Sequence, residues 1–68
     1  MRQVVLHPGE DGLWVAEVPS LPGCISQGET KDEALRSIRE AIDVYVESLE
    51  EDGLPVPEET YDTIIVAL

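Results

Sequence analysis

Residues 30–54 read TKDEALRSIREAIDVYVESLEEDGL and predict one long helix. Thr30 and Glu33 form a capping box, in which the Thr30 hydroxyl accepts from the backbone N–H of Glu33 and the Glu33 carboxylate reaches back to Thr30. Gly53 suits the left-handed position after the last turn, where Leu54 folds back on the helix. Between these signals apolar residues recur three or four positions apart, which is the spacing of one helix face. They are Ala34, Leu35, Ile38, Ala41, Ile42, Tyr45, Val46 and Leu49.

Three short strands are expected before this helix. Residues 2–7 and 13–18 flank residues 8–12, whose Asp-Gly pair supplies the positive φ that a hairpin loop needs. Residues 19–23 read PSLPG and interrupt the pairing, because proline cannot sit inside a central ladder. Residues 24–27 then follow as a third strand, so the first half of the chain predicts a small antiparallel sheet.

A last strand is expected after the helix. Residues 62–68 carry Ile64, Ile65 and Val66 in succession, so this strand is apolar on both faces. The order strand, strand, strand, helix, strand predicts a single small α+β domain over residues 1–68, with the helix on one face of the sheet. Because one helix covers only one face, a homo-oligomer is expected to cover the rest.

The charge balance of the chain excludes some partners. Fifteen acidic residues against four basic ones give a formal net charge of −11 over 68 residues. Nucleic-acid binding depends on lysine and arginine neutralising phosphates, so no direct nucleic-acid binding is expected. A basic protein is the natural electrostatic complement, although solubility alone explains the same charge. The N-terminus shows no signal peptide and no apolar run approaches the roughly 20 residues of a membrane span, so a cytoplasmic location without membrane contact is expected.

Side chains that could carry chemistry are few. The single cysteine, Cys24, excludes an internal disulfide, and together with the single histidine, His7, it gives no recognisable metal-ligand cluster. His7 has no partner in the sequence that would make it a general base, and Cys24 has no neighbour that would make it a thiolate. Trp14 is expected in the core rather than at an interface. The first two strands carry only one carboxylate, Glu17, so no enzyme, cofactor or metal is expected.

The acidic residues gather at the end of the helix. Glu47, Glu50 and Glu51 lie in its last turns, where the negative end of the helix dipole disfavours carboxylates and no basic residue is placed to offset them. Two interpretations remain open, a solvated surface and a docking surface for a basic protein. On the second interpretation these three glutamates are the candidate partner-binding residues.

A set of motifs in a fixed order resembles the HicB-type antitoxin family. Residues 14–24 read WVAEVPSLPGC and are followed by QGET at 27–30 and by Glu-Ala at 33–34. The family has an aromatic-led strand, a Pro-x-Leu-Pro-Gly-Cys turn, and then Gly-Asp/Glu-Thr and Glu-Ala at the start of a helix. Residues 53–57, GLPVP, match the Gly-x-Pro-x-Pro stretch that follows this helix in the family. The resemblance therefore covers nearly the whole chain.

The resemblance implies both a fold and a function. The fold would be a partial ribonuclease H-like sheet of three antiparallel strands, a helix, and a fourth strand beside and parallel to the first. The function would be to neutralise a small HicA-type toxin ribonuclease by masking its RNA site through protein–protein contact, without catalysis.

Two features qualify this expectation. Many such antitoxins continue into a DNA-binding domain, whereas this sequence ends at Leu68, so repression through a domain of that kind is not expected. Short members of the family also occur without an obvious toxin. The alternative is therefore an orphan module that serves as a homo-oligomeric scaffold or binds a small molecule.

Overall fold

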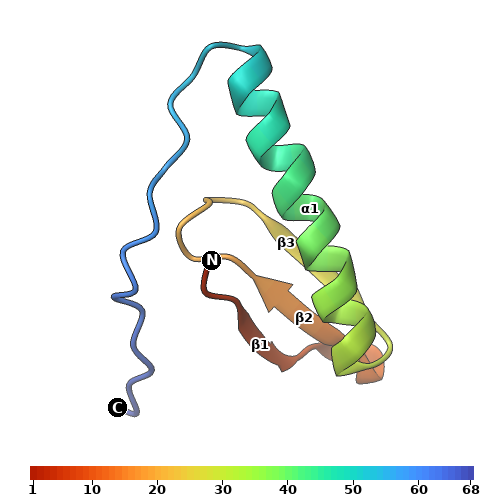
Figure 1. Cartoon of the computed structure of the whole chain (residues 1–68). Coiled ribbons are helices and arrows are strands. Elements are labelled where there is room, and N and C mark those ends of the chain that lie inside the picture. Colours follow the sequence, from red (N-terminus) through yellow and green to blue (C-terminus); the bar gives the residue numbers. More distant parts are fainter.

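Three short strands and one long helix follow one another in the computed structural model, which describes residues 1–68 (Figure 1). The strands are β1 (Val5–Pro8), β2 (Trp14–Glu17) and β3 (Ile25–Gly28), the helix is α1 (Lys31–Glu51), and a 3₁₀ turn covers Glu10–Gly12. The strands form one antiparallel sheet in the order β1-β2-β3. The expected α+β class, with three strands before one helix, is confirmed.

The two faces of the sheet differ in what covers them. Leu6, Ala16 and Ser26 are cross-strand neighbours and share the face toward α1, where Ala16 is completely buried. Successive side chains of a strand alternate between faces, so Val5 and Ile25 belong to the opposite face. Ile25 is 55% exposed there. The single helix thus covers one face and leaves the other open.

The loop between β2 and β3 contributes Leu21, one of the largest fully buried side chains, to the core. Leu21 is fully buried in this loop, whose backbone is closed by hydrogen bonds from the N–H of Val18 to the Cys24 carbonyl at 3.0 Å and from the N–H of Leu21 to the Val18 carbonyl at 3.1 Å. The sequence PSLPG therefore ends the strand pairing and also supplies core volume. The buried residues are Ala16, Val18, Leu21, Cys24, Ala34 and Ile38.

The ends of α1 form largely as the sequence predicts. The Thr30 hydroxyl accepts from the backbone N–H of Glu33 at 3.1 Å, but the Glu33 carboxylate accepts from the N–H of Glu29 at 2.8 Å rather than from that of Thr30. At the other end Gly53 has a φ of 68° and Leu54 donates to the Leu49 carbonyl at 2.9 Å. This is a Schellman ending.

The fourth strand expected at residues 62–68, called the terminal segment below, is not formed. Its residues have no assigned strand, and none of the backbone–backbone hydrogen bonds outside the helix and strands involves a residue beyond Leu54. Tyr61, directly before the segment, has a φ of 54°, a left-handed conformation that breaks the extended path of a strand. The order is therefore corrected to three strands and a helix.

The chain after α1 nevertheless runs beside β1, where the fourth strand was expected (Figure 1). Arg2 Nη2 donates to the Pro57 carbonyl at 2.6 Å, and the backbone N–H of Gln3 donates to the Glu59 carboxylate at 2.7 Å. Thr63 and Ile65 border residues 3–6 across a shallow groove. The direction is parallel to β1, as the family resemblance implies, but side chains rather than a backbone ladder hold the chain in place.

Candidate partner-binding site

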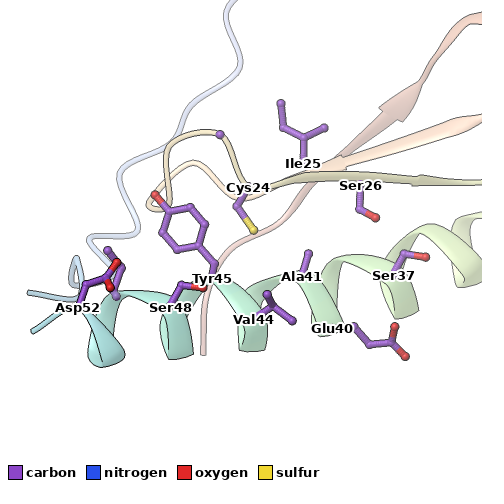
Figure 2. A pocket seen from close by; sticks show the side chains of 12 residues that line it. Cys24, Ile25, Ser26, Ser37, Glu40, Ala41, Val44, Tyr45, Ser48 and Asp52 are labelled. Carbon is purple, nitrogen blue, oxygen red and sulfur yellow. The ribbon is translucent and has the colours of Figure 1, made fainter. Parts of the chain in front are cut away.

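An open groove lies between α1 and the free edge of β3 and is called the α1–β3 groove (Figure 2). Its volume is about 800 Å³. Cys24 and Ser26 point into it toward the helix, whereas Ile25 between them points away to the open sheet face (Figure 2). The residues that line the groove are Gly23, Cys24, Ile25, Ser26, Ser37, Glu40, Ala41, Val44, Tyr45, Ser48, Leu49 and Asp52.

The helix places apolar and small side chains along one wall of the groove. Ala41, Val44 and Ser48 follow one another at spacings of three and four, so they share a stripe on α1. Val44 is 62% exposed, so most of its side chain is open to solvent beside the groove. Tyr45 donates from its hydroxyl to the Pro22 carbonyl at 2.9 Å and closes one end. The wall therefore offers apolar contact to a partner.

The thiol of Cys24, in the groove, is expected to be unreactive. Cys24 is only 4% exposed, and burial raises the pKa of its thiol, with a smaller opposing effect from the charge of Arg2. A raised pKa keeps the group in the neutral form, which is neither a good nucleophile nor a metal ligand. Cys24 thus acts as a small apolar wall residue.

Carboxylates border the groove on its helix side. Glu40 and Asp52 belong to its lining, and Glu47, Glu50 and Glu51 lie next to them on the solvent face of α1. The three predicted residues are all exposed. Glu50 and Glu51 follow Glu47 by three and four positions, so each is a neighbour of Glu47 on the helix surface, although the two diverge from each other by about 100°. Glu51 follows the groove residues Val44 and Ser48 by seven and three positions and is turned toward the groove, whereas Glu50 is turned away from it.

The groove itself was not predicted from the sequence. Its signal was present in the exposed stripe of Ala41, Val44 and Ser48, which flanks the apolar positions used for the core. The stripe indicates a groove only when β3 is known to be an edge strand that lies beside it. The acidic residues were found from their charge, and the hollow beside them depends on tertiary structure.

The remaining candidates lie away from the groove. His7 is exposed on β1, and its Nδ1 is 3.1 Å from the carbonyl oxygen of Pro8. Trp14 is half-buried and packs against the core, as expected, with Lys31 Nζ 4.7 Å from the centre of its rings in a cation–π contact. No three side chains of histidine, cysteine, aspartate or glutamate are grouped so that they could hold a metal ion. None of the chain's helices has the length and apolar character needed to cross a bilayer.

Fold and surface together define a small, acidic α+β domain whose main hollow is an open groove with a carboxylate border. The chain belongs to the HicB-like antitoxin family. The family model described as a HicB-like antitoxin of bacterial toxin–antitoxin systems matches residues 3–65.

Relatives and a solved structure agree with this assignment. A UPF0150 protein of Thermoplasma acidophilum is 46% identical over 63 residues, which cover 93% of this chain and 91% of that protein. A UPF0150 protein of Helicobacter pylori is 50% identical over 50 residues, which cover 74% of this chain and 68% of that protein. The crystal structure of the N-terminal domain of the Burkholderia pseudomallei antitoxin HicB superimposes with a TM-score of 0.74 at 40% identity, covering 88% of this chain and 69% of that one.

Proposed function

We propose that this chain is an antitoxin that binds a small basic toxin ribonuclease of the HicA type and masks its RNA site, without catalysis of its own. Membership of the HicB-like family supports the class of function. The observation that carries the proposal on this molecule is the acidic face of α1, Glu47, Glu50 and Glu51, beside an open groove with apolar walls. Since the proposed toxin cleaves RNA inside the cell, we place the pair in the cytoplasm.

Electrostatics explains why such a surface suits an RNA-binding partner. A ribonuclease must present basic groups to phosphates, and a chain of net charge −11 competes for the same groups. Opposite charges raise the rate of association more than they raise affinity. The apolar wall of Ala41 and Val44 would then add short-range contact once the two proteins have met.

The same chain is proposed to self-associate. The sheet face that carries Val5 and Ile25 has no helix over it, and the side chains of the terminal segment are exposed. A second copy would cover apolar surface that a monomer leaves in water.

A second candidate function is an orphan module that binds a small molecule in the α1–β3 groove. Its volume of about 800 Å³ is within the range of small-molecule sites. Such sites are usually more enclosed than this groove, which is why a protein partner is the leading proposal.

The test is capture of partners from the native host by the tagged protein at low salt, with mass spectrometry of the bound proteins. The antitoxin proposal expects a stoichiometric small basic protein that high salt releases. Recovery of only further copies of this chain would contradict it and favour the orphan module.

The surface assignment needs a matched pair of variants. Replacing Glu47, Glu50 and Glu51 with glutamine should slow association with the captured partner and flatten its dependence on salt. The control removes the same number of charges elsewhere through Glu10→Gln, Asp11→Asn and Glu58→Gln, and it should leave the rate close to that of the wild type. Equal behaviour of the two variants would show that net charge, and not this face, directs binding.

A further inference from the structure

We propose that the basic partner enters the α1–β3 groove as an extended segment, which adds to the free edge of β3 as an antiparallel strand. This mode of binding rests on the proposed antitoxin function and deepens it. Three features of the molecule support it: unpaired backbone groups on β3, room beside them for side chains, and carboxylates on the outer rim of the groove.

The free edge of β3 presents unpaired backbone groups at Ile25 and Gln27. β3 pairs with β2 on its other side only. The N–H of Val18 donates to the carbonyl of Cys24 at 3.0 Å, so these two residues form a hydrogen-bonded pair of the ladder. Bonded and non-bonded pairs alternate along antiparallel strands. Ser26 therefore bonds to β2, whereas Ile25 and Gln27 turn their N–H and C=O groups outward.

The β3 edge is more open than the β1 edge. Beside β1, the N–H of Gln3 already donates to the Glu59 carboxylate at 2.7 Å, and Thr63 and Ile65 lie across a shallow groove. β3 reads ISQG, without the charged residues or prolines that commonly protect an edge from pairing. An incoming strand is therefore obstructed less at β3 than at β1, and strand addition satisfies the outward groups of β3.

An added strand would place every second side chain in the α1–β3 groove. Residues opposite each other in a sheet share a face, so the residue opposite Ser26 points with it toward α1 (Figure 2). The groove wall carries Ala41 and Val44, which favour an apolar side chain at this position. The two neighbouring residues of the added strand, opposite Ile25 and Gln27, point to the open sheet face and bond to β3.

Carboxylates on the outer rim of the groove select a basic segment. Glu40 lies four positions before Val44, and Glu47 and Glu51 lie three and seven positions after it, so all three project from the same side of α1 as this valine. All three are exposed. A lysine or arginine on either side of the apolar residue would extend toward this rim. A second copy of this chain would instead bring like charges together, which disfavours pairing of β3 with β3.

The first test uses the synthetic peptide acetyl-Arg-Thr-Val-Thr-Arg-amide. Its valine suits the groove, its threonines face the open side, and its arginines suit the rim. Binding is followed in amide NMR spectra of the labelled protein, where the signals of Ile25, Gln27 and Val44 should shift. N-methylation of one threonine removes an N–H that faces β3 and should weaken binding about fivefold or more. N-methylation of the valine removes an N–H that faces away and should leave binding unchanged.

Three outcomes of the first test would overturn the proposal. They are any other ranking of the two methylated peptides, the absence of shifts at β3, and shifts at β3 that depend on the concentration of the protein alone. The last outcome would show that a second copy of the chain occupies this edge.

The second test changes the protein. Gln27→Pro removes an outward N–H and keeps the ladder to β2, because proline is tolerated on an edge strand where its nitrogen faces solvent. This variant should bind the peptide about fivefold more weakly or less, whereas Gln27→Ala keeps the N–H and should bind as the wild type does. Equal binding by the two variants would overturn the proposal. An unchanged helical circular dichroism signal shows that each is folded, and if the proline variant is not, the methylated peptides decide.

The acidic rim has its own matched pair of variants. Glu40→Gln should weaken binding of the peptide about threefold at low salt, because it removes one exposed charge beside the groove. Asp43→Asn removes one exposed charge from another side of α1 and should leave binding unchanged. An equal effect of both variants would show that net charge, and not the rim, attracts the segment.

The basic protein captured from the native host separates failure of this proposal from failure of the antitoxin function. It should bind Gln27→Pro more weakly than Gln27→Ala. Equal binding to both would leave the antitoxin function standing and refute strand addition at β3. If no basic protein is captured, the antitoxin function fails, and the peptide measurements still decide whether the β3 edge accepts a basic strand.

Discussion

The hydroxyl of Tyr45, in the fourth turn of α1, donates a hydrogen bond to the carbonyl of Pro22 at 2.9 Å. This contact joins the helix to the loop that carries the buried Leu21 and closes one end of the α1–β3 groove. One phenol thus links the packing of the core to the shape of the proposed binding surface.

Tyr45→Phe should lower the free energy of unfolding by up to about 1 kcal/mol, because a partly exposed hydrogen bond of this kind contributes little more. The measurement is urea denaturation followed by Trp14 fluorescence. Ser48→Ala removes a hydroxyl from the same groove that has no hydrogen bond of its own, and it should change the stability by much less. A larger loss for Ser48→Ala would contradict the role given to Tyr45.

Thr30→Ala should cost about 0.5–2 kcal/mol, because it removes the acceptor at 3.1 Å from the backbone N–H of Glu33 at the start of α1. Thr30→Ser keeps this acceptor and should restore most of the stability. Thermal unfolding of the three proteins provides the comparison. Equal stability of the alanine and serine variants would show that the hydroxyl does not cap the helix.

Gly28→Ala should destabilise the fold by about 1–3 kcal/mol, because a Cβ at this position would lie 2.5 Å from the backbone nitrogen of Ala34 and 2.7 Å from Glu33 Cβ. The end of β3 and the first turn of α1 would have to separate. Gly53→Ala has open space around its Cβ and is strained only by a φ of 68°, so it should cost about 1 kcal/mol. Denaturation of both variants tests this ranking, and a greater loss at Gly53 would contradict it.

Acid should weaken the attachment of residues 57–61 to the N-terminus. Hydrogen bonds from the backbone N–H groups of Tyr61 and Gln3 hold the pKa of the Glu59 carboxyl below its usual 4.5. A lowered pKa in the folded state means that the ionised group stabilises the fold above about pH 4.5 and loses this contribution as the pH falls through the lowered pKa.

The variant Glu59→Gln isolates this effect from the other carboxylates. It should be less stable than the wild type at neutral pH, and the difference should shrink as the pH falls below 4.5. Glu58→Gln serves as the neighbouring control and should follow the wild type throughout. A difference that stays constant with pH would show that the charge of Glu59 does not matter.

Local signals in the sequence were enough for much of this fold. Thr30 and Gly53 marked the ends of α1 because capping depends on residues within one turn. The Asp-Gly pair likewise predicted the hairpin turn, where Asp11 and Gly12 have φ values of 59° and 74°. Such features depend on neighbours in the chain, which a single sequence displays directly.

Features that depend on distant contacts were missed. The terminal segment has strand-forming residues, yet nothing in its own sequence reveals that Tyr61 is left-handed or that the chain provides no cover beyond β1. The burial of Leu21 inside a proline-rich loop also follows from tertiary packing. The groove beside Val44 depends on which strand forms the edge of the sheet. The sequence therefore predicted the acidic face from its charge but did not predict the groove next to it.

The central claim, neutralisation of a basic toxin ribonuclease, is tested most directly by RNA cleavage. The small basic protein captured from the native host is purified, and its cleavage of RNA is followed while this chain is added. The antitoxin account predicts that cleavage falls in proportion and stops near one equivalent of this chain. Undiminished cleavage in the presence of excess folded protein would contradict it.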